Sequence, residues 1–150
     1  MTTIYLLTAP ASAVRTLQFA AGELQRCLNR MNGDPLAKIV ARPQYLPDEP
    51  GLWLGLFANV SLTPPTTHPL DDEIHIAVNG GTGLAGPNGL IAGSNPRSAL
   101  MAVYRYLWAL GCRWLRPGAD GEVIPQGTGG LRPVRLAERA SYRHRGICIA

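Results

Sequence analysis

One amphipathic stretch constrains the fold of this 150-residue chain more than any other segment. Between residues 14 and 31, apolar side chains recur at steps of three and four residues: Val14, Leu17, Ala21, Leu24, Leu28 and Met31. This spacing places them on one stripe of an α-helix about five turns long. Ser12 is the candidate N-cap, and Asn32 with Gly33 provides the signal that ends the helix.

Short apolar runs at residues 4–7 and 37–41 flank this helix and are typical of buried strands. The first forty residues therefore predict a β-α-β unit with parallel strands and a right-handed crossover. Three further runs predict strands at residues 52–56, 74–78 and 90–93, and the last two form a hairpin around a glycine-rich turn.

A second helix is predicted to begin after Asn95, which can cap it, with Pro96 in its first position. Gly111 ends that helix, and residues 112–115 are predicted to return to the sheet as another strand. The expected fold class is α+β: a two-layer sandwich of a mixed sheet, with about five or six strands and two long helices on one face. Such a sheet leaves its other face for a neighbouring domain to cover.

Composition excludes several classes of protein. Hydrophobic residues make up 46% of the chain, which suits one soluble domain, and a net charge of +4 is too small for an obligate nucleic-acid binder. No apolar run approaches the roughly 20 residues that cross a membrane. Cys27, Cys112 and Cys148 form neither a disulfide framework nor a C-x-x-C pair, and we interpret them as buried reduced thiols. The sequence favours a cytoplasmic location, with secretion left open for a trimmed chain.

The motifs that usually carry chemistry are missing or out of context. Residues 81–86 match G-x-G-x-x-G, but a strand follows them instead of the helix that would bind a pyrophosphate. The histidines His68, His75 and His144 lack metal-ligand spacing, and the acids at residues 71–73 are typical of a solvated strand end. We therefore predict no catalytic residue, no metal and no cofactor in this segment.

The last twenty residues differ from the rest, because five arginines precede an apolar run at residues 146–150. A natural chain seldom ends inside an apolar run. We expect residues 1–130 to form the α+β domain and residues 131–150 to be a linker followed by the first strand of another domain.

The order of these parts resembles the N-terminal domain of α-glucuronidases of glycoside hydrolase family 67. It is also similar to the domain before the barrel in family 20 β-N-acetylhexosaminidases. Four segments carry the resemblance: residues 20–28, 52–55, 89–107 and 110–118, with the pattern Y-x-x-L-x-x-L-G-x-R-W from Tyr104 to Trp114 as the most specific part.

The resemblance implies a zincin-like domain without zinc ligands or catalytic residues, packed beside a (β/α)8 barrel that hydrolyses glycosidic bonds. Residues 142–147 would then enter the first barrel strand, and Arg145 would be a substrate-binding residue. We expect a non-catalytic accessory domain whose partners are that barrel and, through it, a carbohydrate, with no membrane or nucleic-acid partner. The alternative is an autonomous carbohydrate-binding module in which Trp53 and Trp114 are stacking platforms for sugar rings.

Overall fold

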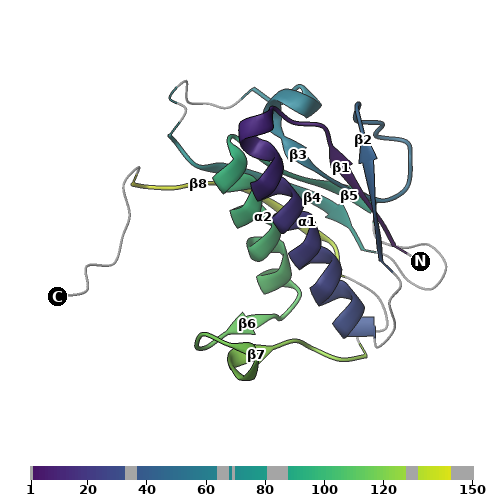
Figure 1. Ribbon diagram of the computed structural model, residues 1–150, viewed down its shortest axis with the longest axis vertical. Coiled ribbons are helices and arrows are strands. Elements are labelled where there is room, and N and C mark those ends of the chain that lie inside the picture. Colours follow the sequence, from purple (N-terminus) through teal and green to yellow (C-terminus); the bar gives the residue numbers. More distant parts are fainter. Residues whose placement is uncertain are drawn as a thin grey trace.

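The computed structural model shows a mixed six-stranded sheet with two helices against one of its faces (Figure 1). It describes residues 2–32, 37–63, 68, 70–80, 88–127 and 132–142. The elements in chain order are β1 (Thr3–Leu7), α1 (Ala11–Asn32), β2 (Lys38–Arg42), β3 (Leu52–Leu56), the 3-10 turn η1 (Phe57–Val60), β4 (Glu73–Asn79), β5 (Asn88–Gly93), α2 (Pro96–Ala109), β6 (Arg113–Trp114), the 3-10 turn η2 (Ala119–Gly121), β7 (Glu122–Val123) and β8 (Val134–Arg139).

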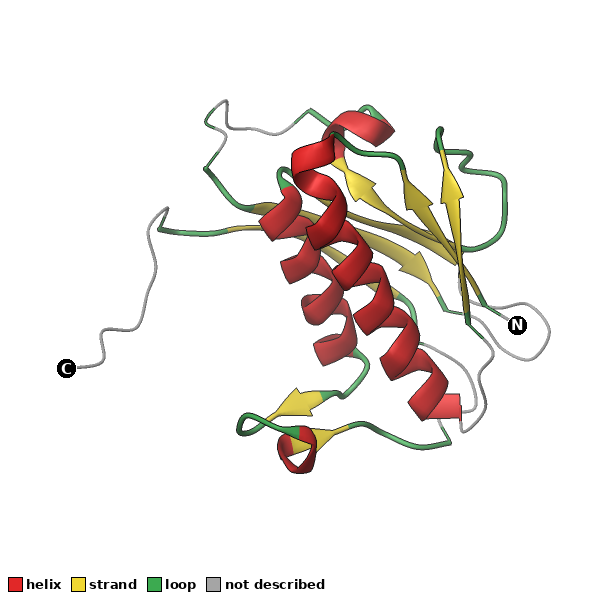
Figure 2. Cartoon of the chain, viewed as in Figure 1, coloured by secondary structure: helices red, strands yellow, loops and turns green. Residues whose placement is uncertain are grey.

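The strands lie in the order β2-β1-β3-β5-β4-β8. The neighbours from β2 to β5 are parallel, whereas β4 is antiparallel to both β5 and β8. Both helices lie on the same side of this sheet (Figure 2). The α+β class, the mixed sheet, the parallel β1-α1-β2 unit and the β4-β5 hairpin predicted from the sequence are confirmed.

Local sequence explains how α2 begins. The Asn95 side chain accepts a hydrogen bond from the Ser98 backbone N–H at 2.9 Å, and the Ser98 hydroxyl accepts one from the Asn95 N–H at 2.9 Å. This reciprocal cap, with Pro96 next to it, fixes the start of α2 as predicted. For α1 the predicted cap is wrong, because the helix begins at Ala11 and Ser12 already lies in its first turn.

Two strand assignments differ from the sequence prediction. β6 pairs only with β7, in a separate two-stranded sheet, so residues 112–115 do not return to the main sheet. β8 pairs along its whole length with β4, from Val134 beside Val78 to Arg139 beside Glu73. Residues 134–139, which the sequence assigned to a linker, therefore belong to the sheet of this domain.

Apolar side chains pack on both faces of the sheet. The larger cluster lies between the sheet and the helices and includes Leu24, Leu28 and Tyr106. The smaller one lies on the far face, around Trp53 and Phe57. Val40 of β2 packs against it, as do three side chains from the connecting segments: Tyr45, Val60 and Leu62. The expectation that this face waits for a neighbour is wrong over β1, β3 and β5, because the chain covers it itself.

Candidate docking surface on the helical layer

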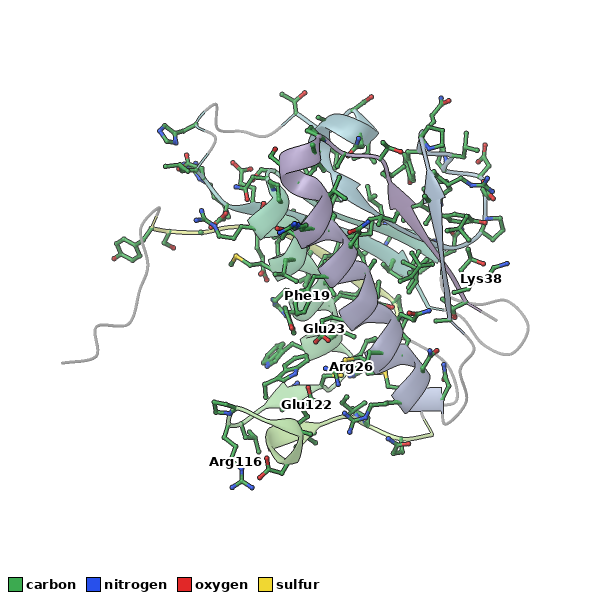
Figure 3. The ribbon with its side chains drawn as sticks, viewed as in Figure 1. Phe19, Glu23, Arg26, Lys38, Arg116 and Glu122 are labelled. Atoms are coloured by element: carbon green, nitrogen blue, oxygen red, sulfur yellow. The ribbon has the colours of Figure 1, made fainter. Side chains whose placement is uncertain are left out.

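The outer face of the helical layer carries large exposed apolar side chains. Phe19 on α1 is 56% exposed, Trp108 on α2 is 49% exposed, and Leu115 after β6 is 75% exposed. In Figure 3, Phe19, Glu23 and Arg26 follow one another along α1 towards the β6-β7 hairpin, where Glu122 lies. We call the exposed face formed by Phe19, Glu23, Arg26, Tyr104, Arg105, Trp108, Trp114, Leu115 and Glu122 the helical surface.

A network of charges holds the lower part of this surface together. The Arg26 guanidinium donates hydrogen bonds to Glu23 at 2.9 Å and to Glu122 at 2.7 Å. Arg30 donates to the second oxygen of Glu122 at 2.6 Å, and the Trp114 indole N–H donates to Glu122 at 3.3 Å. Two carboxylates thus meet two guanidinium groups, and the network ties the hairpin to α1.

The charges of this network persist over a wide pH range. The hydrogen bonds from Arg26 lower the pKa of Glu122 to about 2 and also lower the pKa of Glu23. Both carboxylates raise the pKa of Arg26 in return. Charge-assisted bonds of this bidentate kind fix side-chain geometry as well as contributing energy. The charged part of the helical surface is therefore held in one arrangement by its own hydrogen bonds.

Aromatic rings extend the network along α2. The Tyr104 hydroxyl donates to Glu23 at 3.0 Å, and its ring packs edge-on against Trp114 with 5.0 Å between centroids. Burial, and then the hydrogen bond to Glu23, raise the pKa of Tyr104 to about 12. Trp108 lies beside two guanidinium groups, 5.0 Å from that of Arg105 and 4.4 Å from that of Arg113. Aromatic residues and arginine are the residue types enriched at protein interfaces.

An open hollow lies where the helical surface meets the β6-β7 hairpin. Its volume is about 620 Å³, and Arg26, Trp114 and Glu122 form one wall, with residues 115–119 forming the other. Arg116 at its rim is paired with Asp120 at 2.7 Å. The hollow has room for a partner side chain.

The structure separates the residues that the sequence proposed for carbohydrate binding. Trp53 lies in the far-face cluster, where its ring is 1% exposed, stacks on Tyr5 at 4.3 Å and donates its N–H to the Glu49 carbonyl at 3.1 Å. The interpretation of Trp53 as a sugar platform is wrong, because neither ring face reaches the solvent. Trp114 is half-buried and borders the hollow. Arg145 lies outside the described residues, as does the glycine motif at residues 81–86.

Sequence reasoning missed most of the helical surface. Phe19 interrupts the polar side of the α1 pattern, and Trp108 lies off the α2 stripe. Single exposed apolar residues are common on protein surfaces, so these two positions become informative only when the fold places them on one face. Glu23 and Arg26 stand three residues apart, the spacing of an ion pair on a helix. Nothing in the sequence indicated that Glu122 would join them, since 96 residues separate it from Arg26.

Within the described ranges, no three His, Cys, Asp or Glu side chains are grouped so that they could hold a metal ion. No helix in the same ranges combines the length and hydrophobicity required to cross a membrane. In comparisons with known proteins, the sequence matches no protein-family model and no curated protein.

Proposed function

We propose that this chain is a non-catalytic accessory domain, which packs its helical surface against a catalytic glycoside hydrolase barrel of the α-glucuronidase type. The observation that carries the proposal is the exposure of Phe19, Trp108 and Leu115 beside a charge network that is already internally paired. Large apolar side chains exposed to solvent favour burial against a partner.

The free energy that docking would contribute follows from the exposed fractions of these three side chains. Fully burying such a side chain contributes about 1.5 to 3 kcal/mol, so covering the exposed part of each contributes roughly 1 kcal/mol or more. Three such side chains alone make a weak interface between separate proteins. Within one polypeptide the linker supplies a high effective concentration, and a weak interface is then sufficient. A neighbouring domain of the same chain is therefore the favoured partner for the helical surface.

The resemblance carried by residues 89–107 and 110–118 supplies the nature of that neighbour. The cytoplasmic location inferred from the sequence belongs to the same proposal.

Two assays test the accessory role. The polypeptide encoded after Ala150, produced separately, should associate with this chain. Phe19→Ser with Trp108→Ser should weaken the association, whereas Leu46→Ser should not, because Leu46 is similarly exposed (44%) but lies outside the helical surface. The 150-residue chain alone should hydrolyse no aryl glucuronide. A stop codon directly after Ala150, an equal effect of Leu46→Ser, or clear turnover by the chain would overturn the proposal.

The hollow beside Trp114 favours one alternative, an autonomous carbohydrate-binding module. Calorimetric titration with uronic-acid oligosaccharides distinguishes the two functions. Saturable binding that Trp114→Ala abolishes and Trp108→Ala preserves would favour the module. No heat of binding would favour the accessory domain.

A further inference from the structure

A second, smaller pocket lies on the opposite side of the sheet and is independent of the docking proposal. It has a volume of about 210 Å³ and lies between β4, β8 and the segment after β3. Six of its lining residues matter here: Phe57, Leu62, Glu73, His75, Ala137 and Arg139. The side chains of the first two are apolar and belong to, or pack against, the far-face cluster.

Glu73 brings a buried carboxylate to this pocket. The residue is 5% exposed, and its Oε1 atom is buried and accepts no hydrogen bond from any residue that the structure describes. Its backbone is fixed on both sides by Ser94: the Glu73 N–H donates to the Ser94 hydroxyl at 3.1 Å, and the Ser94 N–H donates to the Glu73 carbonyl at 2.9 Å. An unpaired carboxylate oxygen held in this way is costly unless a donor reaches it.

The surrounding charges do not supply that donor. Arg139 stands directly across the strand pair from Glu73, but its guanidinium pairs with Asp71 at 3.5 Å. Arg105 pairs with Glu138 at 2.7 Å, and Arg97 pairs with Asp72 at 3.0 Å. Within the described part of the chain, no ion pair joins Glu73 to His75, which lies two residues further along β4. The nearby arginines are thus committed to other carboxylates.

We infer that this pocket binds a small organic cation, namely a primary ammonium or guanidinium group on a short aliphatic stem. The N–H groups of such a cation would donate to Glu73, and its stem would lie against Phe57, Leu62 and Ala137. At about 30 Å³ per water-sized group, the volume of about 210 Å³ has room for roughly seven non-hydrogen atoms, so a slightly smaller cation fits. A neutral ligand lacks the charge that compensates the carboxylate, and an anion is repelled by it.

NMR titration of the 150-residue chain tests the inference directly. n-Butylammonium and ethylguanidinium are the probes, and n-butanol and butyrate are the analogues of similar size without the positive charge. The cations should shift the amide signals of β4 and β8 saturably, and the analogues should bind at least roughly tenfold more weakly. Equal binding of butanol, or no saturable shift, would overturn the inference and leave water as the partner of Glu73.

Two variants test whether the Glu73 carboxylate is the charge that binds the cation. Glu73→Gln keeps the shape of the side chain and should weaken cation binding at least roughly tenfold. Glu138→Gln is the matched control, because it removes the same charge from the neighbouring strand, but the Glu138 carboxylate is paired with Arg105 of α2 on the helical side of the sheet; it should change the affinity less than about twofold. Similar losses in both variants would mean that general negative charge attracts the probe, which contradicts a specific site.

A third variant covers the case in which Glu73→Gln fails to fold. Ala137→Leu leaves the carboxylate in place but fills part of the pocket from an exposed strand position. It should abolish the shifts caused by both cations. Unchanged affinity in Ala137→Leu would show that the cations bind elsewhere.

Discussion

Replacing Trp53 with alanine separates the two roles that the sequence allowed for this residue. In the structure its ring stacks on Tyr5, meets the edge of the Tyr45 ring at 5.3 Å and hydrogen-bonds to the Glu49 carbonyl. The indole therefore holds together the far face of the sheet and the segment that covers it. Removing the indole should therefore lower the stability of the whole domain. If Trp53 were only a sugar platform, the substitution would weaken sugar binding and leave stability unchanged.

The magnitude follows from burial. A tryptophan that is 1% exposed buries about 200 Å² of mostly apolar surface, which corresponds to about 5 kcal/mol at 25 cal/mol per Å². Substitutions of this kind in protein cores cost about 3 to 5 kcal/mol. Since whole domains are stable by only about 5 to 15 kcal/mol, Trp53→Ala should lie close to the threshold of folding.

Urea denaturation followed by circular dichroism measures this loss. The midpoint should fall, with little change in the slope, which depends on the surface exposed by unfolding. Trp108→Ala is the matched control: its ring is 49% exposed and contacts two guanidinium groups, so about 1 kcal/mol should be lost. A smaller loss in Trp53→Ala than in Trp108→Ala would refute the reasoning.

For three further substitutions the structure predicts whether the stability of the domain rises or falls. Gly93→Ala should prevent folding or destabilise strongly, because a Cβ there would overlap the backbone N of Ala99; thermal denaturation measures the loss of stability. Tyr106→Phe should stabilise by about 1 kcal/mol in urea denaturation, since the phenol hydroxyl is buried without a hydrogen-bond partner among the described residues. Glu122→Gln should be less stable than the wild type at neutral pH. Because the pKa of Glu122 is lowered from 4.5 to about 2 in the folded state, its contribution is complete above about pH 4.5 and is lost as the pH falls towards 2.

Controls for these substitutions are available in the chain. Gly22→Ala in α1 meets no atom within 4 Å of its new Cβ, and it should stabilise the helix by about 0.5 to 1 kcal/mol. Equal effects of Gly93→Ala and Gly22→Ala would contradict the packing argument. A Tyr106→Phe variant that loses stability would reveal a partner for the hydroxyl. Parallel stability curves for wild type and Glu122→Gln from pH 7 to pH 2 would contradict the charge network.

Sequence predicted the elements that local rules determine. The stripe from Leu17 to Met31 requires only helical periodicity and an apolar partner layer, and the cap formed by Asn95 and Ser98 requires only neighbouring residues. The β4-β5 hairpin also depends on a short connection. In each case the interactions that determine the element join residues close together in the chain, so the element can be predicted from one sequence.

The missed elements depend on partners far along the chain. In β8, Val134 and Leu136 alternate with charged residues, which is a strand signal, but three nearby arginines made the segment resemble a linker. Its partner β4 lies about sixty residues earlier, so only the folded sheet shows the pairing. β6 contributes just two residues, too few for any periodicity to indicate which sheet it joins.

The covering of the far face changes which surface is available for a partner. Tyr45 and Phe57 come from the segments that occupy that face over β1, β3 and β5, whereas Phe19, Trp108 and Leu115 of the helical surface stay exposed. Because Arg26 and Glu122 order that surface in advance, docking there does not have to immobilise long side chains. Glu122→Gln should therefore lower both the stability and the association of the chain with its neighbour. Phe19→Ser should lower association alone, since its side chain is more than half exposed. Association that survives both changes would place the interface elsewhere.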